Sequence, residues 1–432
     1  MNRRTFLKSV NFFLYSLLIG FRAKANMVTT SWIPSGRRIP AMQGYTDDTS
    51  TQVILLVAEG EKLHYAVTDD RGKTLAIDSV QPTSYPNSRY RLDRLTLTKL
   101  PKSSIFTLTV YNSKNETIDT RMFQTLDISD DSMKIGLMSC MDDRVNNHKA
   151  MWKSVSEKQA DILFFLGDNV YVDDEEVRVT PDTIWERHVE TRMALDVYQT
   201  ELLTPIIGIW DDHDYAMDDG DTRFTYKDES LRIFKAFFGS NDGTYLSNGP
   251  GVSSYVSLFN QRFVFLDSRY YREKGSRMKG KIWGSEQIAW VQAKLDNQCF
   301  KPVWFINGSQ FYGGYQRYES VERESISELN QMISIAKNLA APVIFVAGDV
   351  HYSEISNLEK NILGYESVEL TSSAIHSTPA DDVSDNPRRT YVTQENNYMI
   401  VETKVHRSAL ELNINIYGRN QTYHTTRRTV AK

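Results

Sequence analysis

DILFFLGDNVYVDD, residues 161–174, is the stretch that says most about the architecture of this chain. Its five apolar residues from Ile162 to Leu166 show no polar alternation, as expected of a parallel strand that is covered on both faces. The run ends at Gly167-Asp168-Asn169, and ligands of open α/β sheets bind at such carboxyl ends. Asp168 could instead cap a helix, but residues 170–177 show no helical period of apolar side chains. The stretch therefore predicts a buried strand followed by a functional loop.

The same change from apolar to polar residues recurs after residue 131. Two segments with helical apolar periods, 285–297 and 322–340, lie between such runs. Strands that alternate with helices predict a layered α/β domain. Besides the run before Asp168, five apolar runs end in polar clusters: KIGLMS before Cys140, PIIGIW before Asp211, RFVFL before Asp267, PVWFI before Asn307 and PVIFVA before Gly348.

The segment before this domain has β character throughout. Short β-branched and aromatic runs between residues 26 and 130 are separated by Gly, Pro and Asn at the spacing of an antiparallel sandwich. Residues 95–125 resemble the last strands of a fibronectin type III or immunoglobulin-like module. We therefore expect three parts: residues 1–25, a β-sandwich over 26–130 and an α/β domain over 131–432.

The N-terminus has the order of an export signal. Arg3 and Arg4 precede Phe6-Leu7-Lys8, an apolar segment over 10–21 and an Ala-Lys-Ala sequence at 23–25. The paired arginines favour the twin-arginine type, which would make the twin-arginine translocation machinery a transient partner and the protein periplasmic or secreted. The alternative is a basic N-terminus without a targeting role.

Composition excludes several classes of protein. With 41% hydrophobic and 24% charged residues, the chain has the composition of an ordinary globular protein. A net charge of −5 argues against a nucleic-acid-binding surface, which would be basic. Two cysteines, Cys140 and Cys299, allow one disulfide at most, so the chain is no disulfide scaffold.

The acidic residues at the strand ends predict bound cations. If Asp168, Asp212 and Asp349 meet at one rim, each like-charge pair at about 4 Å costs on the order of 4 kcal/mol at an effective dielectric of 20. A carboxyl dyad that shares a proton is the smaller alternative. Cys140 and Tyr171 favour a transition metal, ferric iron in particular, whereas carboxylates favour calcium, magnesium or manganese. We therefore expect at least two metal ions.

Six motifs follow one another along the chain: Cys140, GDNVY at 167–171, WDDHD at 210–214, LDSRYYR at 266–272, GSEQIAWVQAKL at 284–295 and GDVH at 348–351. In this order they resemble the alkaline phosphatase D (PhoD-like) family of the calcineurin-like metallophosphoesterases. The resemblance covers residues 131–373 and extends to a sandwich domain in front of them. It implies an iron and calcium site, of two or three ions, that hydrolyses phosphate esters.

The resemblance also implies roles for single residues. Asp168 matches the carboxylate that bridges the metals, and Tyr171 and Cys140 match iron ligands. Asp212 stands where relatives outside the family usually carry Asn, and Asp349 where they carry His. Both differences give the site harder oxygen ligands, which suits calcium.

The two motif histidines have different expected roles. His351 is a metal ligand, a neighbour that supports a ligand, or a hydrogen-bonded core histidine. His213 lies beside Asp212 and fits the proton donor to the leaving group. His376 is left without a role.

Further polar residues have two interpretations each. Asp142 coordinates metal through water or caps Arg144, and Arg269, with Arg272, clamps phosphate or pairs with Asp267. The acidic loops 173–176 and 218–221 are expected to be solvated. Three amides at strand ends are candidates for contact with metal or phosphate, with a structural role as the alternative: Asn169, Asn307 and Gln310.

The expected activity is hydrolysis of a phosphate ester by a metal-bound hydroxide. Monoesters and diesters are both open as substrates, since the C-terminal residues 422–432 show no helical period that would predict a closing helix over the site. The alternatives are a phospholipase-type phosphodiesterase on the same site and an exported binding or adhesion protein with a structural metal site.

Overall fold

The computed structural model describes residues 38–145, 148–173, 178–239, 249–275, 279–295, 299–314, 318–383 and 385–432. The expected export signal at 1–25 lies outside the described residues. Within these ranges, none of the helices combines the length and the apolar character that crossing a membrane requires.

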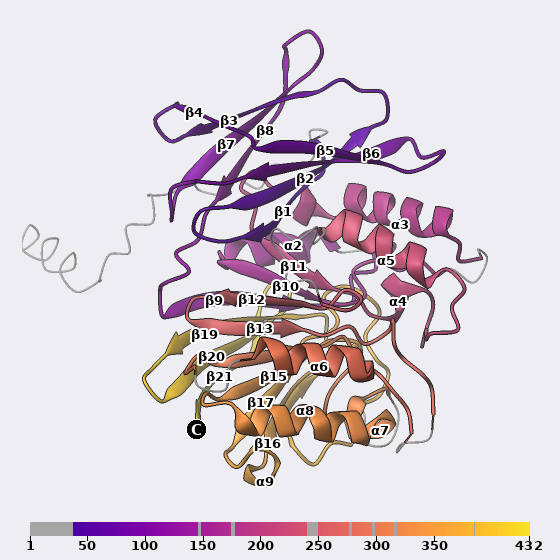
Figure 1. Cartoon of the computed structure of the whole chain (residues 1–432), viewed down its shortest axis with the longest axis vertical. Coiled ribbons are helices and arrows are strands. Elements are labelled where there is room, and N and C mark those ends of the chain that lie inside the picture. Colours follow the sequence, from indigo (N-terminus) through magenta and orange to yellow (C-terminus); the bar gives the residue numbers. More distant parts are fainter. Residues whose placement is uncertain are drawn as a thin grey trace, which may run out of the picture. The chain divides into compact units, whose positions relative to one another are not determined.

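Two antiparallel four-stranded sheets form the N-terminal part and share one apolar core (Figure 1). We call them the N-terminal sheet pair. They confirm the β character expected for this part of the chain. The first sheet has the order β1 (Ala41–Thr46), β2 (Thr51–Ala58), β6 (Tyr90–Leu97) and β5 (Ser79–Ser84). The second has the order β4 (Thr74–Leu75), β3 (His64–Asp69), β7 (Ile105–Tyr111) and β8 (Thr117–Gln124).

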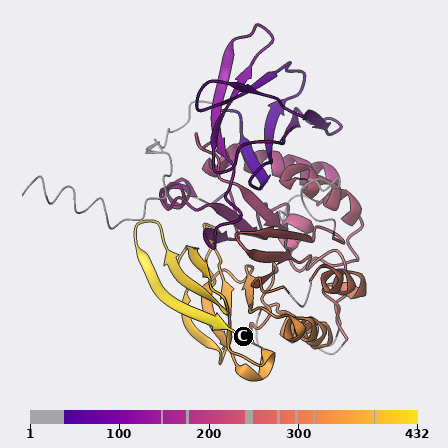
Figure 2. The same ribbon diagram turned by 60° about the vertical axis from the view of Figure 1, so that its left-hand side comes forward.

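A six-stranded sheet begins the following part. Its first three strands are parallel, and the last three continue the sheet from β9, each antiparallel to the strand before it (Figure 2, yellow). The C-terminal residues 422–431 thus form a strand. The order is β11 (Ile206–Ile209), β10 (Ile162–Leu166), β9 (Ser132–Met138), β19 (Tyr398–Val405), β20 (Ala409–Tyr417) and β21 (Thr422–Ala431).

A seven-stranded sheet carries the other apolar runs. β13, β14, β15 and β17 are parallel, and the remaining strands are antiparallel to their neighbours. The order is β12 (Ser254–Leu258), β13 (Gln261–Phe265), β14 (Val303–Ile306), β15 (Val343–Ala347), β17 (Ser367–Thr371), β16 (Ser353–Leu358) and β18 (Arg389–Thr393). Together with the six-stranded sheet, it makes this part of the chain a mixed α/β structure.

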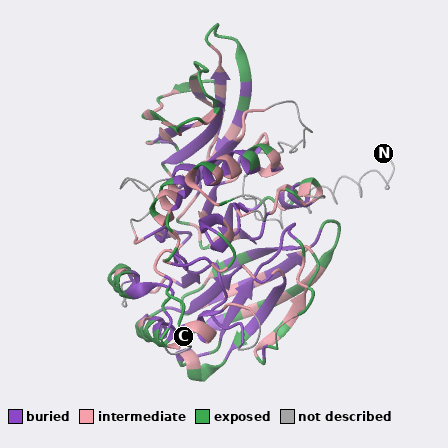
Figure 3. Ribbon diagram, turned by 90° about the vertical axis from the view of Figure 1, so that its right-hand side faces the viewer, coloured by how far each residue is buried: buried purple, intermediate pink, exposed green. Residues whose placement is uncertain are grey.

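The strand β10 is buried on both faces, as its sequence predicts. The ring of Phe164 lies 5.1 Å from that of Phe263 and 5.0 Å from that of Phe265, in the core between the two large sheets. The ring of Phe165, on the opposite face, lies 5.9 Å from that of Trp152 in α2 (His148–Glu157). Figure 3 shows the inner strands as buried residues. Because neither face meets water, the strand needs no polar alternation.

Helices cover the outer faces of the large sheets. Near β10 and β11 lie α2, α3 (Pro181–Ala194), the short η1 (Asp196–Tyr198), α4 (Asp212–Tyr215) and α5 (Lys227–Phe238). α6 (Gly284–Lys294) confirms most of the helix expected over 285–297, but it ends at Lys294, since Leu295 is extended. The helix expected over 322–340 is two helices, α7 (Val321–Glu324) and α8 (Ile326–Asn338), with a break at Ser325. α9 (Lys360–Leu363) follows β16.

Candidate metal centre

The carboxyl ends of strands from both large sheets meet at one place. Cys140 follows β9, Asp168 follows β10, Asp211 and Asp212 follow β11, and Asp349 follows β15. Potential ligand atoms of the described residues lie within 4.8 Å of one another in four groups. One group joins Asp212 to the exposed Asp218 and Asp219, and the other three overlap one another at the strand ends. These three groups are Cys140, Asp168 and His351; Asp168, Asp212 and His213; and Asp211, Asp212 and Asp349. The strand ends expected at one rim thus come from two sheets.

The backbone turns sharply at four of these residues. The φ angles are 59° at Cys140, 51° at Asp168, 75° at Asp349 and 56° at His351. For residues with a β-carbon, this left-handed region costs roughly 1–2 kcal/mol each. Such strain concentrates at functional sites, where surrounding structure holds the side chain in a required direction.

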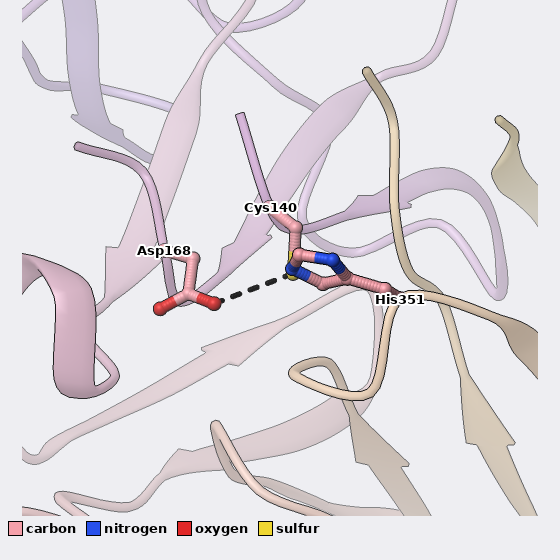
Figure 4. Close-up of side chains that lie close together, drawn as sticks. All are labelled: Cys140, Asp168 and His351. Carbon is pink, nitrogen blue, oxygen red and sulfur yellow. Dashed lines mark hydrogen bonds between the residues drawn. The ribbon is translucent and has the colours of Figure 1, made fainter. Parts of the chain in front are cut away.

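The thiol of Cys140 is fully buried beside Asp168 and His351 (Figure 4). Its Sγ lies 3.4 Å from Oδ2 of Asp168, and the hydroxyls of Ser139 and Ser373 lie at 3.1 and 3.0 Å. Burial, and next the charge of Asp168, raise the pKa of the Cys140 thiol well above its usual value. A nearby cation would reverse this preference and favour the thiolate.

His351 presents one ring nitrogen to this group. Its Nδ1 lies 2.6 Å from the carbonyl oxygen of Thr378, so Nδ1–H donates and Nε2 carries the lone pair. Nε2 lies 3.1 Å from the hydroxyl of Tyr171. Burial lowers the pKa of His351, which keeps the imidazole neutral. Burial, followed by the charges of Cys140 and Asp168, raises the pKa of the Tyr171 phenol well above its usual value. Both residues could therefore bind a cation at this point.

At this centre, four buried carboxylate oxygens have no hydrogen-bond partner among the described residues. They are Oδ1 of Asp168, Oδ2 of Asp211, Oδ1 of Asp212 and Oδ2 of Asp349. Oδ1 of Asp212 has one ion-pair contact, at 3.5 Å from a guanidinium nitrogen of Arg269. Unpartnered buried carboxylates are costly, and hard cations with oxygen ligands would compensate them. The donor set therefore fits bound metal.

The pKa values of these aspartates reflect their crowding. Burial, followed by the charge of neighbouring carboxylates, raises the pKa of Asp168 and that of Asp349 well above the usual value. For Asp212, burial also raises the pKa, but the charges of Arg269 and His213 outweigh it and lower the pKa. The carboxylates of the cluster thus carry more negative charge than the positive side chains of Arg269 and His213 neutralise.

His213 is held by a residue outside the strand ends. Its Nδ1 lies 2.8 Å from an oxygen of Asp173, and its ring stacks on that of Tyr171 with 4.3 Å between centroids. Burial alone lowers the pKa of His213, but the carboxylates of Asp168, Asp173 and Asp212 raise it to about 11. Cations at the aspartates would reduce this increase. The Nδ1–H donates to Asp173, which leaves Nε2 for chemistry.

The side chain of Arg269 pairs with carboxylates other than the expected Asp267. Its fully buried guanidinium pairs with Asp211 and with Glu319, at 2.8 Å from the latter. Asp267 accepts only its backbone N–H, at 2.9 Å. The guanidinium therefore orients Asp211. The expected pairing with Asp267 is wrong because burial brings closer a carboxylate far away in the sequence.

The amide candidates have partners inside the fold. Asn307 accepts from the indole N–H of Trp283 at 3.0 Å and donates to the carbonyl of Ser309 at 2.6 Å. Gln310 donates to Glu354 at 3.1 Å and to Thr371 at 2.9 Å. Asn169 donates to the carbonyl of Ile209 at 2.7 Å, which ties the loop after β10 to β11. Their observed contacts are structural.

Two further side chains lie behind the centre. Asp142 pairs with Arg144 at 2.8 Å and accepts its backbone N–H, which favours the capping role. His376 accepts from the indole N–H of Trp152 at 3.2 Å, and its Nδ1 lies 3.0 Å from the carbonyl of Asp142. His376 is thus a hydrogen-bonded core histidine.

Three acidic residues of the centre could not be identified from the sequence. Asp211 stands next to Asp212 in WDDHD, and no pattern separates the two. Asp214 accepts backbone N–H groups of Asn169 and Asp211, at 2.9 and 3.0 Å. Asp173 belongs to a loop expected to be solvated, which is wrong for this residue because its carboxylate holds His213. Only the tertiary contact identifies it.

A comparison of the chain with protein-family models found no match, and neither did a comparison with curated proteins.

Proposed function

We propose that the chain is an exported, metal-dependent phosphate-ester hydrolase of the alkaline phosphatase D type, within the calcineurin-like metallophosphoesterases. The observation that carries the proposal is the set of buried carboxylate oxygens without a hydrogen-bond partner on Asp168, Asp211, Asp212 and Asp349, beside a buried thiol and phenol. The N-terminal sheet pair would be the immunoglobulin-like or fibronectin-like domain that precedes such enzymes.

The ligand types divide the centre between two kinds of cation. Cys140, Tyr171 and His351 offer the sulfur, phenol and imidazole that suit ferric iron. Asp211, Asp212 and Asp349 offer only oxygen, which suits calcium. Asp168 belongs to two of the groups and would bridge the ions.

Bound cations would lower the pKa of a coordinated water and neutralise phosphate oxygens. The protein supplies the remaining steps. His213, protonated at Nε2, donates that proton to the departing alkoxide. Asp173 accepts the Nδ1–H and so fixes the ring orientation and tautomer. Arg269 holds Asp211 in place, with a second contact from the hydroxyl of Ser268 at 2.9 Å.

The export proposal depends on the N-terminal sequence. The paired arginines at positions 3 and 4 would direct folded protein to the twin-arginine machinery and place it in the periplasm or outside the cell. Export after folding suits a protein whose buried centre takes up iron before it leaves the cytoplasm.

A side-by-side assay tests the proposed activity. Purified protein should release nitrophenol from p-nitrophenyl phosphate, from bis(p-nitrophenyl) phosphate or from both, and Asp168→Ala should lower the rate at least roughly 100-fold because its metals are lost. Asp228→Ala is the control, since Asp228 is exposed and its carboxylate accepts from the phenol of Tyr270. Protein that keeps its metals and hydrolyses neither ester would favour the binding or adhesion alternative.

A further inference from the structure

The N-terminal sheet pair contacts the segment that leads into the metal centre. Residues 199–205 connect η1 to β11. The backbone N–H of Met122, in the edge strand β8, donates to the carbonyl of Glu201, and that of Leu203 donates to the carbonyl of Met122, both at 2.8 Å. A parallel bridge joins Gln43, in the edge strand β1, to Pro205. The segment thus pairs with one edge of each N-terminal sheet.

The pairing extends into the apolar core. Leu203 is 2% exposed and belongs to the core cluster of the N-terminal sheet pair, with Val53, Leu95 and Phe123. The core of the N-terminal part therefore includes a side chain from the part that follows. Moving the segment would open that core and uncover two strand edges, which are prone to pair with other chains.

Arg121 fastens the beginning of this segment. Its guanidinium is fully buried and donates to the carbonyl of Thr200, to that of Ile39 at 2.6 Å and to Asp119 at 3.0 Å. One side chain from β8 thereby binds the segment that enters β11. Only four residues, the strand β11 itself, separate the end of this segment from Trp210.

Arg94 fastens the chain after the centre. It lies in β6, is 6% exposed, and donates to the carbonyls of Lys235 and Ala236 at 3.3 and 3.1 Å. These carbonyls belong to the last turn of α5, where helix carbonyls lack intrahelical partners and a positive charge is favourable. α5 in turn contacts the end of α4, the short helix that begins with Asp212 and His213. The hydroxyl of Ser230 in α5 donates to the carbonyl of Tyr215 in α4 at 2.7 Å.

We propose that the N-terminal sheet pair positions the segment that carries Asp211, Asp212 and His213, with Arg121 and Arg94 as positioning residues that hold the chain before β11 and the end of α5 after this segment. The inference rests on the proposed function only in taking this segment as a metal-binding segment. It gives the N-terminal sheet pair a role inside the enzyme. Because the segment is held from both sides, its aspartates keep their spacing without being anchored by the metal itself.

Variants on one strand of the sheet pair test the proposal. Arg94→Met keeps the apolar stem and removes the donors to α5. In metal-free protein, the amides of residues 211–216 should then exchange with solvent about tenfold faster, while those of β15 do not change. Calcium affinity measured by calorimetry should fall by about 10-fold, as for other residues that support metal ligands. Arg94→Lys retains a positive charge and hydrogen-bond donors. It should therefore keep most of the exchange protection and most of the calcium affinity.

Arg91→Met is the matched control. Arg91 lies on the same strand and contacts Asp93 and the carbonyls of Ala58 and Glu61, all within the N-terminal sheet pair. Arg91→Met should change neither the amide exchange of residues 211–216 nor the calcium affinity. Equal effects of Arg91→Met and Arg94→Met would overturn the proposal, since they would indicate general loosening of the N-terminal part.

A second variant keeps the test open if Arg94→Met does not fold. Arg121→Lys cannot reach both carbonyls that the guanidinium binds, so it should also speed exchange at residues 211–216. Unchanged exchange in this variant refutes the proposal. The exchange measurement needs neither metal nor substrate, so an absence of phosphate-ester hydrolysis would count against the proposed function and leave this result standing.

Discussion

The Nδ1 atom of His213 lies 2.8 Å from a carboxylate oxygen of Asp173, although 40 residues separate the two. A ring nitrogen of His213 also lies within 4.8 Å of carboxylate oxygens of Asp168 and Asp212. The contact with Asp173 connects the loops after β10 and β11, because Asp173 follows the first strand and His213 the second. The pair therefore has the arrangement of a proton donor and the residue that orients it.

Removal of His213 should separate chemistry from metal binding. His213→Ala should keep its metals while kcat falls by roughly 10²–10⁴ for alkyl phosphates. For nitrophenyl esters the loss should be smaller, because nitrophenolate departs without a proton. Steady-state kinetics with both ester types and elemental analysis check this. Loss of the metals, or equal slowing of both esters, would show that His213 is a ligand or a substrate contact, and His351 would be the next candidate acid.

The pH dependence of kcat should depend on the carboxylate of Asp173. The carboxylate of Asp173 contributes to the raised pKa of His213, and a proton donor loses activity as pH rises through its folded pKa. Asp173→Asn should therefore move the alkaline limb of kcat to lower pH, with metal content unchanged. An alkaline limb at the same pH in this variant would mean that another group limits the rate there.

Tyr171 should give the protein its colour. A phenolate bound to ferric iron absorbs visible light, so iron-loaded protein should be coloured and Tyr171→Phe should bleach it while iron remains. Tyr270→Phe is the matched control, because that phenol donates to Asp228 away from the centre. A colourless iron-loaded wild type, or colour that survives in Tyr171→Phe, would remove Tyr171 from the ligands.

His188 should make the fold sensitive to acid. Its buried ring stacks on Phe237 at 4.8 Å, and burial lowers the pKa of His188 to about 3. Because the unfolded state takes up a proton below about pH 6.5 and the folded state does not, stability is lost as pH falls from there toward 3. The loss for this residue is roughly 2 kcal/mol between pH 7.5 and pH 5.

Urea unfolding at pH 7.5 and at pH 5 measures this loss of stability. His188→Phe should retain roughly 2 kcal/mol more of its stability at pH 5 than the wild type retains. His64→Gln, at an exposed position, is the control and should follow the wild type. An unchanged pH dependence in His188→Phe would contradict the assigned role of the buried ring.

The absence of a side chain at Gly308 should be required for the position of the Asp211 carboxylate. A β-carbon there would lie 2.6 Å from Oδ1 of Asp211, closer than β-carbons approach other atoms. Gly308→Ala should therefore displace this carboxylate and lower both calcium content and activity. Gly44→Ala, where the nearest atom would be 3.8 Å away, should change neither. Full calcium content in Gly308→Ala would show that Asp211 is not a ligand.

The buried strands could be predicted because their sequences leave little choice. Ile162 to Leu166 is apolar at every position, and a run of this length that is followed by glycine favours a strand covered on both faces. The break at Ser325 could not be predicted, since the apolar period of Ile326, Leu329 and Ile333 continues that of one longer helix. Local periodicity carries no information on such a kink.

The centre could be predicted only where its residues directly follow strands. Cys140, Asp168 and Asp349 each stand at a strand end, so the direction of the strands alone brings them to one rim. Asp173 and Arg269 act through partners 40 and 58 residues away, and pairs of that kind leave no local pattern. The division of the strands between two sheets also depends on pairing that the sequence does not display.

The most direct test is the metal content of the active protein. Correctly exported protein should contain both iron and calcium by elemental analysis, a calcium chelator should abolish hydrolysis, and added calcium should restore it. This follows from the oxygen ligands of Asp211, Asp212 and Asp349 beside the thiol of Cys140. Protein that contains zinc alone and remains fully active after chelation of calcium would contradict the account.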